Sequence, residues 1–423
     1  MTLRAHTWIA ACLIGLACGV VERPFIADAQ GESRVPDRRR EQFQGDSGYA
    51  VFPYVFDLPG IGTGYGVLGA VNNIAGTYMD AAGTFFEGDV SGQAVGLESI
   101  HLIPKTLIFD IGGASISRVT FQSFRQRGMN TGKDDYTEAE LSDMLGISTR
   151  LTATFFDRRL EGFVGYYGSQ GKLMSLRDNE GRLIVQTVGT SPEWSDTDVI
   201  GARLDLTDDY MDPRRGVRFE PSVWWSPPQG AAANSFFVDA SISAYVPMGK
   251  LSTWAFNYLR SDAYVVEKGE TDPVRVAERE GLDYSESADP RERQYVDSMV
   301  AANTYGNATS LGGFSRLRSY PESRYRGAHT EFVGTEFRWN LTEETKPFDL
   351  FFVKDIRTAI QVAPFYEIGT VADHAGDLWS TMRSTYGIGL RVVTASGLIY
   401  RFDLATGDEG FQPSVFFQYP WEL

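Results

Sequence analysis

Short stretches in which apolar and polar residues alternate recur along almost the whole chain. In 332–341 one face is apolar apart from a threonine, and the other is charged or small: Val333, Thr335, Phe337, Trp339 and Leu341 against Gly334, Glu336, Arg338 and Asn340. The same alternation is found in 360–369, 386–392 and 398–404. A period of two places successive side chains on opposite faces of a β-strand. Helical periodicity is almost absent, so the pattern predicts an all-β protein.

Two all-β architectures fit this pattern, a soluble β-sandwich array and a transmembrane β-barrel. Glycine is abundant (44 residues), aromatic residues make up 13% of the chain, and the mean hydropathy is only −0.22. Alternating lipid-facing and lumen-facing residues dilute hydropathy in this way. Beyond the first thirty residues, no window approaches 18 continuous apolar residues, which argues against spanning helices. Four consecutive strands with one mainly apolar face favour a barrel with lipid outside and a charged lumen.

The N-terminus has the features of a secretory signal peptide. Arg4 is followed by an uncharged stretch over 7–21 and by the small-residue cleavage site Ala27-Asp28-Ala29. We therefore expect residues 1–29 to be removed and 30–46 to form a short, charged, disordered periplasmic tail. A single anchoring helix and a lipoprotein signal ending at Cys12 are the alternatives. Because Cys12 and Cys18 are the only cysteines, cleavage leaves a mature chain without a thiol.

The composition and the motifs argue against several function classes. A net charge of −16 is unfavourable for nucleic-acid binding. The four histidines (His6, His101, His329 and His374) are far apart, so we expect no metal site and no cofactor. The G-x-G-x-x-G match at 64–69 has no helix after it and fits glycine in a strand better than a nucleotide site. Two of the inward carboxylates Glu336, Glu367 and Asp403 could be proposed as an acid–base pair, but inward charges in barrels are mostly structural, so we expect no enzyme.

One segment resembles a known family. The residues 311–320 read Leu-Gly-Gly-Phe-Ser-Arg-Leu-Arg-Ser-Tyr, which is similar to the loop signature of the BamA/TamA superfamily (bacterial surface antigen, D-fifteen type). Gly312 and Gly313 match its glycine pair, and Leu317, Arg318, Ser319 and Tyr320 match its hydrophobic-Arg-Gly-aromatic tetrad, with serine in place of glycine. Further segments resemble the family in the expected order: 53–66 at the start of the barrel, 205–216 at a periplasmic turn, and 334–337, 366–371, 387–391 and 401–403 in the last strands.

This resemblance implies a 16-stranded antiparallel transmembrane β-barrel with a long sixth extracellular loop folded into the lumen. We expect the barrel over 47–423 and the long loop over 263–328. The strands are expected as a first hairpin in 62–76, followed by strands near 78–88, 92–102, 107–120, 145–156, 161–174, 198–208, 217–225, 236–247, 251–262, 329–341, 358–370, 383–393, 398–405 and 411–421. The connections 157–159, 249–250 and 395–397 should then be periplasmic turns.

The resemblance also implies roles for individual residues. Arg318 should lie at the tip of the loop inside the lumen, near the inward-facing Glu336 and Glu367. Serine at 319 disfavours a tight turn with positive φ, so the tip should be looser than in relatives. The periplasmic turn should use Asp205, Asp208, Pro213 and Gly216. The C-terminal strand should carry an assembly signal in alternating residues: Val415, Phe417, Tyr419 and Trp421.

The family's assembly machines carry POTRA modules before the barrel, and the tail 30–46 is too short for one. Two functions therefore remain open: insertion or translocation of proteins or lipids at the outer membrane, and a passive channel or structural surface protein that keeps only the fold. The expected partners are outer-membrane lipids and, for the first function, outer-membrane protein or lipid substrates, with a monomeric barrel. Most of the insertion 263–310, with ten acidic and five basic residues, should project into solvent as a cap or surface loop.

Overall fold

A computed structural model of the chain describes residues 42–43, 48–124, 126–186, 193–342, 347–350, 353–394 and 399–421. Eighteen strands are assigned in this part of the chain, and all sheet pairings are antiparallel. The strands are β1 (Gly48–Leu58), β2 (Gly62–Asn72), β3 (Asp80–Gly88), β4 (Ser91–Ile103), β5 (Leu107–Phe124), β6 (Tyr136–Phe155), β7 (Leu160–Asp178), β8 (Leu183–Gln186), β9 (Glu193–Asp205), β10 (Gly216–Ser226), β11 (Asn234–Pro247), β12 (Ser252–Glu267), β13 (His329–Asn340), β14 (Pro347–Leu350), β15 (Val353–Ala372), β16 (Arg383–Thr394), β17 (Ile399–Gly407) and β18 (Gly410–Phe417).

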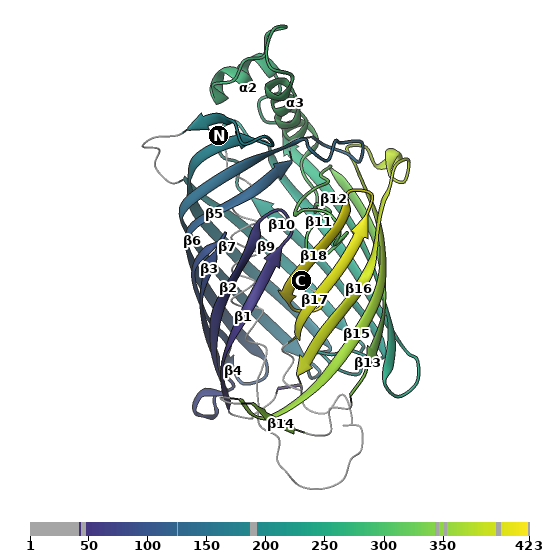
Figure 1. Ribbon diagram of the computed structural model, residues 1–423. Coiled ribbons are helices and arrows are strands. Elements are labelled where there is room, and N and C mark those ends of the chain that lie inside the picture. The colour runs from purple at the N-terminus through teal and green to yellow at the C-terminus, as the bar shows by residue number, and fades with distance from the viewer. Residues whose placement is uncertain are drawn as a thin grey trace.

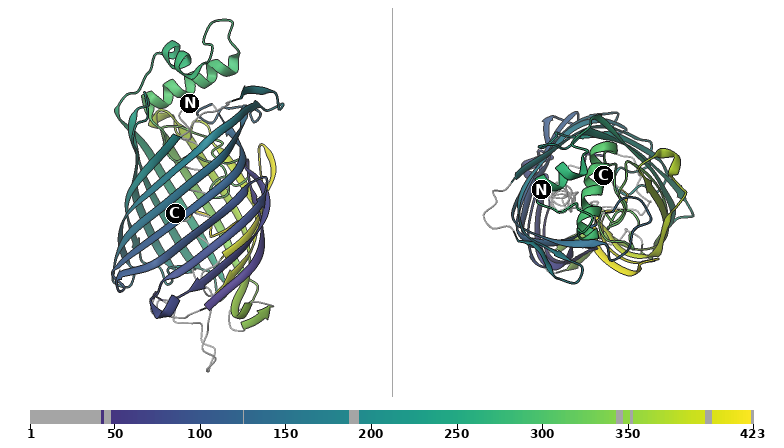
Figure 2. Two further views of the ribbon diagram at one scale, coloured as in Figure 1. Left: turned by 90° about the vertical axis from the view of Figure 1, so that its left-hand side faces the viewer. Right: turned by 90° about the horizontal axis from the view of Figure 1, so that it is seen from above.

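The strands form a closed barrel, which is seen end-on in Figure 2. β8 pairs only with β7, and β14 pairs only with β15. β7 pairs directly with β9 and β13 with β15, which leaves sixteen of the described strands in the ring. Pairing of β1 with β18 closes it. The predicted 16-stranded antiparallel barrel is confirmed.

The two faces of the wall differ as the alternation predicts. In β13, Val333 and Trp339 are exposed, whereas Glu336, Arg338 and Asn340 are buried inside. In β15, Ile360 and Tyr366 are exposed and Gln361 and Glu367 are buried. The outer surface is thus mainly apolar and the interior carries the charges. Among the described residues, no helix is long and apolar enough to cross a membrane.

The strand boundaries differ from the prediction at the N-terminal side. The expected hairpin in 62–76 is wrong, because β1 already begins at Gly48 and forms a continuous ladder with β2. β6 begins at Tyr136, nine residues before the expected start, because polar residues such as Glu138 and Glu140 alternate with apolar ones beyond the apolar belt. The turn expected at 395–397 and the signal peptide expected at 1–29 lie outside the described residues.

The 263–310 segment contains two helices that the sequence pattern did not indicate. β12 continues to Glu267, and two helices follow, α2 (Pro273–Glu280) and α3 (Pro290–Tyr305), which stand on the rim of the barrel (Figures 1 and 2). The Asp272 side chain accepts a hydrogen bond from the Val274 N–H and caps α2. Val276, Ala277 and Val296 form a small buried cluster between the helices. The segment 263–310 therefore contains more regular structure than its charged composition indicates.

The height of the wall varies around the ring. β5, β6 and β7 have 18, 20 and 19 residues, whereas β17, β18, β1, β2 and β3 have 9, 8, 11, 11 and 9. Figure 1 shows these shorter strands side by side at the front of the barrel. The wall is therefore lowest where the first and last strands meet.

Candidate functional site

The segment 311–325, here called the loop segment, is a compact loop stabilised by its own backbone. Leu311 and Tyr325 exchange two hydrogen bonds of 2.9 Å, and the Gly313 N–H donates to the Tyr320 carbonyl at 2.8 Å. Gly312 and Gly313 have φ values of 109° and 104°, which favour glycine. A Cβ on Gly312 would lie 2.2 Å from the Pro321 carbonyl oxygen, so the glycine pair is required sterically.

Arg318 in this segment contacts the buried faces of three strands. Its Nε donates to Glu367 of β15 at 2.9 Å, and its Nη1 donates to Asp403 of β17 at 2.8 Å. Its Nη2 lies 3.0 Å from Oε1 of Glu336 on β13. The Glu367 carboxylate also accepts the backbone N–H of Arg318 at 3.0 Å, and the guanidinium lies 3.5 Å from the Phe365 ring centroid. All four charged side chains are fully buried.

Three further arginines surround the same carboxylates. Arg391 is hydrogen-bonded to Glu336, with its Nη1 at 2.9 Å, and Arg338 Nε donates to Glu336 at 3.2 Å. Arg401 Nη1 lies 3.4 Å from Asp403, and its Nη2 donates to the Phe314 carbonyl of the loop segment. Four arginines against three carboxylates give the cluster a net charge of +1. We call these seven residues the charge cluster: Arg318, Glu336, Arg338, Glu367, Arg391, Arg401 and Asp403.

The other residues of the predicted signature pack around Arg318. Leu317 and Tyr320 are fully buried, and the Tyr320 hydroxyl donates to the Ser384 carbonyl at 3.2 Å. Ser319 is buried against Gly407, whose Cβ position would lie 2.4 Å from the Ser319 Oγ. The positive φ falls on Leu317 (52°) and not on Ser319, so serine is accommodated at 319 without strain there.

Residues 418–421 turn into the barrel. β18 ends at Phe417, earlier than the strand 411–421 predicted from sequence, because Gln418 takes a φ of 81°. Tyr419 and Trp421 are consequently buried rather than continuing the strand. Trp421 Nε1 donates to Glu367 at 3.0 Å, and the Tyr419 ring centroid lies 3.8 Å from the Arg338 guanidinium. Of the four residues of the expected C-terminal signal, only Val415 and Phe417 lie in β18.

Backbone pairing between β1 and β18, here called the closing seam, is sparse. One register pair joins the two strands, Asp57 with Val415, whereas β1 forms eleven pairs with β2 and β18 forms eight with β17. The Val55 carbonyl accepts a hydrogen bond of 2.8 Å from the hydroxyl of Tyr400 on β17, which reaches past β18. Tyr54 and Tyr400 contact the Phe417 ring with centroid distances of 5.3 and 5.0 Å. Side chains therefore contribute more to this seam than a β-ladder does.

The loop segment contacts both sides of the closing seam. On the β18 side, Phe314 stacks on Phe416 with centroids 4.0 Å apart, and Arg324 forms an ion pair of 2.7 Å with Glu409 in the β17–β18 turn. On the β1 side, the Glu322 N–H donates to the Pro59 carbonyl in the β1–β2 turn at 2.9 Å. Removal from water raises the pKa of the half-buried Glu322 carboxyl to about 7, although Arg326 opposes this shift. The loop segment thus bridges the two edges that would separate if the seam opened.

The predicted turn residues lie together at the opposite end of the barrel. Asp205 is fully buried, accepts the Thr207 N–H at 2.9 Å and binds Arg218 Nη2 at 3.2 Å. Asp208 accepts the N–H groups of Arg214 and Arg215, both at 2.9 Å. Pro213 is buried in the same connection. Gly216 has a φ of 116°, and a Cβ there would lie 2.3 Å from the Leu206 carbonyl oxygen.

Sequence reasoning missed an aromatic and charged cluster beside this turn. The Tyr210 ring centroid lies 3.7 Å from the Arg158 guanidinium, and the Tyr210 hydroxyl donates to Glu161 at 3.1 Å. Gln42 accepts the Tyr210 N–H at 2.9 Å, and Phe43 is buried against His101. The expectation of a disordered tail over 30–46 is therefore wrong for 42–43, while 30–41 and 44–46 lie outside the described residues. Pairing of residues so distant in sequence leaves no periodic signal.

Within the described ranges, no group of three His, Cys, Asp or Glu side chains has the geometry to hold a metal ion. The three carboxylates of the charge cluster each form an ion pair with Arg318. The arrangement of the cluster is suited to fixing the loop segment and the chain end against the wall.

The fold defines the class as a closed antiparallel β-barrel. No family model and no curated protein matches the sequence. Among solved structures, the chain is similar to BamA from Haemophilus ducreyi lacking POTRA domains 1–3 (12% identity, 90% of this chain and 69% of that chain, TM-score 0.46). It is also similar to CdiB from Escherichia coli (12%, 90% and 68%, 0.48) and to CdiB from Acinetobacter baumannii (10%, 87% and 59%, 0.46). Similarity at this level concerns the fold alone and carries no argument about function.

Proposed function

We propose that this chain is an outer-membrane barrel that takes part in inserting or translocating proteins or lipids, and that it acts at the closing seam. The observation that carries the proposal is the single register pair between β1 and β18. Unpaired strand edges are templates for pairing with another chain. A seam with few hydrogen bonds costs less to open than any neighbouring ladder of eight or eleven pairs.

The height of the wall supports the same site of action. An eight-residue strand such as β18, tilted at about 45°, covers roughly 20 Å of membrane, less than the ~25 Å apolar band of such barrels. Lipid next to the seam would have to thin locally, which lowers the barrier for a segment entering from the side. The exposed apolar residues Val55, Val67 and Phe85 around the seam suit contact with lipid.

The contents of the barrel argue against a passive channel in this proposal. The loop segment and the chain end occupy interior positions through the fully buried Arg318, Tyr320 and Trp421. In this proposal the segment 263–328 is the long sixth extracellular loop, its part 311–325 (the loop segment) is folded into the lumen, and the turn at 205–216 is periplasmic. The barrel is monomeric, nucleic acid and cofactors have no part in the function, and the partners are lipids and unfolded outer-membrane proteins.

Locking the seam tests this function. Residues 30–423 contain no cysteine, so in a chain that begins at residue 30, Asp57→Cys with Val415→Cys gives one defined disulfide across the register pair. Val67→Cys with Phe85→Cys, a register pair between β2 and β3 with both side chains exposed, is the matched control. The purified barrel in liposomes should accelerate the folding of an unfolded outer-membrane barrel. Oxidation should abolish the acceleration only in the 57/415 variant, and reduction should restore it. Equal activity of both oxidised variants, together with steady large conductance, would instead indicate a passive channel.

A further inference from the structure

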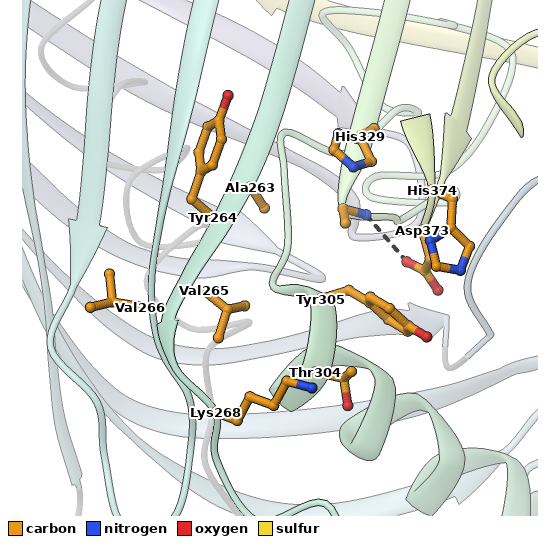
Figure 3. A pocket seen from close by; sticks show the side chains of 11 residues that line it. Ala263, Tyr264, Val265, Val266, Lys268, Thr304, Tyr305, His329, Asp373 and His374 are labelled. Atoms are coloured by element: carbon orange, nitrogen blue, oxygen red, sulfur yellow. Dashed lines mark hydrogen bonds between the residues drawn. The ribbon is translucent and has the colours of Figure 1, made fainter. Parts of the chain in front are cut away.

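A cavity of about 500 Å³ opens at the rim that carries the helices. Figure 3 shows it between the end of β12, the end of α3, the start of β13 and the connection after β15. Its chemistry-bearing side chains are Tyr264, Lys268, Tyr305, His329, Asp373 and His374. The cavity shares no residue with the charge cluster, because none of the seven cluster residues lines it.

The acidic member of this cavity is already neutralised. Asp373 accepts from Arg127 Nε at 2.9 Å and from the Ala328 N–H at 3.2 Å. Arg127 is fixed there, because it also donates to the Gly306 carbonyl at 2.8 Å. Asp373 therefore offers little negative charge to a ligand.

The cationic member, in contrast, is available. Lys268 is exposed, and among the described residues no carboxylate lies within 4.0 Å of its ammonium group. In Figure 3 its amino group points toward Thr304 and Tyr305. With Arg127 and Asp373 cancelling, Lys268 leaves the cavity with a charge of +1 before either histidine is counted. This positive charge contrasts with the net charge of −5 over 263–310, which has ten acidic and five basic residues.

The remaining side chains that line the cavity are suited to contact with a sugar ring. The Tyr305 and His374 rings meet edge to face with centroids 5.1 Å apart, and the apolar faces of sugars pack on such rings. Thr304 Oγ1 donates to the Val300 carbonyl at 2.7 Å and keeps its lone pairs for a hydroxyl donor. His329 Nδ1 is hydrogen-bonded to Asp262 at 2.6 Å, which fixes the ring and leaves Nε2 for a ligand. A few polar groups converging in a cavity of this size are typical of a small-molecule site.

The position of the cavity matches the headgroup level of the proposed membrane. The outward row of β12 runs through the exposed Trp254, Phe256 and Tyr258 and then reaches Arg260 and Asp262, which pair at 2.6 Å. The apolar belt therefore ends near Tyr258. The cavity begins five residues later, roughly 15 Å further along the strand.

We propose that this cavity binds a phosphate-bearing saccharide, with the phosphate at Lys268 and the sugar against Tyr305 and His374. Such a group occurs in the headgroup of a phosphorylated glycolipid and in soluble sugar phosphates. Only the glycolipid source rests on the membrane setting of the proposed function. Binding of a soluble sugar phosphate is independent of insertion activity, so the two proposals can fail separately.

The first test titrates the full chain, in nanodiscs of zwitterionic lipid, with glucose 1-phosphate, glucose or inorganic phosphate by calorimetry. Glucose 1-phosphate should bind more tightly than either fragment, because it alone uses both halves of the cavity. Lys268→Gln should weaken it about tenfold or more, and His374→Gln several-fold. Lys250→Gln, at an exposed lysine in the β11–β12 turn at the opposite end, is the matched control and should stay within twofold. No binding by the wild type, or equal losses in the Lys268 and Lys250 variants, would overturn the proposal.

The second test separates the two sources. Native mass spectrometry of the detergent-solubilised chain with a phosphorylated disaccharide lipid should show a retained adduct that glucose 1-phosphate displaces and that Lys268→Gln lacks. Retention of this kind assigns the site to a headgroup. Binding of glucose 1-phosphate with no Lys268-dependent adduct assigns it to soluble sugar phosphates. Inorganic phosphate binding as tightly as glucose 1-phosphate would disprove the saccharide part of the proposal.

Discussion

At the residue scale, the interior depends on charges that compensate one another. Alternation in the sequence placed Glu336, Glu367 and Asp403 on the inner face, and their burial in β13, β15 and β17 agrees with it. Alternation could not pair them with Arg318, because a period of two fixes the face of a strand and not its register. The pairing expected for Arg318 came from the resemblance alone. Neither alternation nor the family resemblance predicted the cluster around Tyr210.

Arg318→Ala should destabilise the barrel strongly. The substitution leaves Glu367 and Asp403 buried without their main partner, and breaking a buried ion pair in this way typically costs 3–5 kcal/mol. The folded, fast-migrating band in unheated gels should convert to the unfolded band at a lower temperature. Arg275→Ala, on the exposed surface of α2, is the control and should change nothing. An unchanged transition temperature for the Arg318→Ala variant would show that the contacts of Arg318 in the loop segment do not stabilise the barrel.

Glu322 should make the loop segment sensitive to pH. Its pKa is raised to about 7 from an ordinary value of 4.5, so the folded state binds this proton more tightly than the unfolded state. The resulting stabilisation is fully present below pH 4.5 and is lost as the pH rises through about 7. Urea unfolding at pH 5 and pH 8 should therefore differ more for the wild type than for Glu322→Gln. An equal pH dependence in both proteins would exclude Glu322 as the source.

At the scale of elements, strands were easier to predict than their ends. The barrel strands from β9 to β17 follow alternation, whereas β18 ends at Phe417 because Gln418 and Trp421 adopt positive φ, which the aromatic pattern of 411–421 does not reveal. α2 was missed although Asp272, Pro273 and Gly281 are capping signals, because its charged composition suggested a solvated loop.

Two C-terminal deletions should distinguish the contribution of β18 to folding from that of the buried residues Tyr419 and Trp421. Deletion of 411–423 removes β18 and leaves both β17 and β1 with open edges, so no folded barrel should form in membranes. Deletion of 418–423 keeps β18 but removes the buried Tyr419 and Trp421, and truncation of a buried Phe or Trp side chain typically costs about 3–5 kcal/mol. This shorter deletion should give a folded but less heat-resistant band. Insertion of the longer deletion as a folded barrel would contradict the role given to β18.

The helices should report which end of the barrel faces outward. The exposed link between α2 and α3, residues 281–289, offers a site for limited proteolysis, whereas the helices protect each other through Val276 and Val296. Protease added to intact cells should cut in or next to this link and leave the barrel assembled. Cleavage only after the outer membrane is permeabilised would invert the proposed topology.

At the scale of the whole molecule, the height of the barrel wall is asymmetric. The ring has a tall side at β5–β7 and a low side at β17–β3, and the single-pair seam lies in the low side. The count of sixteen strands was implied by the family resemblance, and the barrel confirms it. The weakness of the seam could not be predicted, because it arises from where β18 turns inward and from Tyr400 reaching Val55 across it.

The central claim is that the edge of β1 receives a substrate strand. A photocrosslinking residue at position 55 on β1 lies at the seam. The same residue at position 67 on β2, which pairs with both β1 and β3, lies beside the seam and is similarly exposed. The barrel in liposomes is mixed with an unfolded outer-membrane barrel and irradiated during its folding. We predict a crosslink to the terminal strand of the substrate from position 55 and none from position 67, and its loss when 57 and 415 are joined by a disulfide. Equal crosslinking from both positions, or crosslinking that survives the locked seam, would contradict the account.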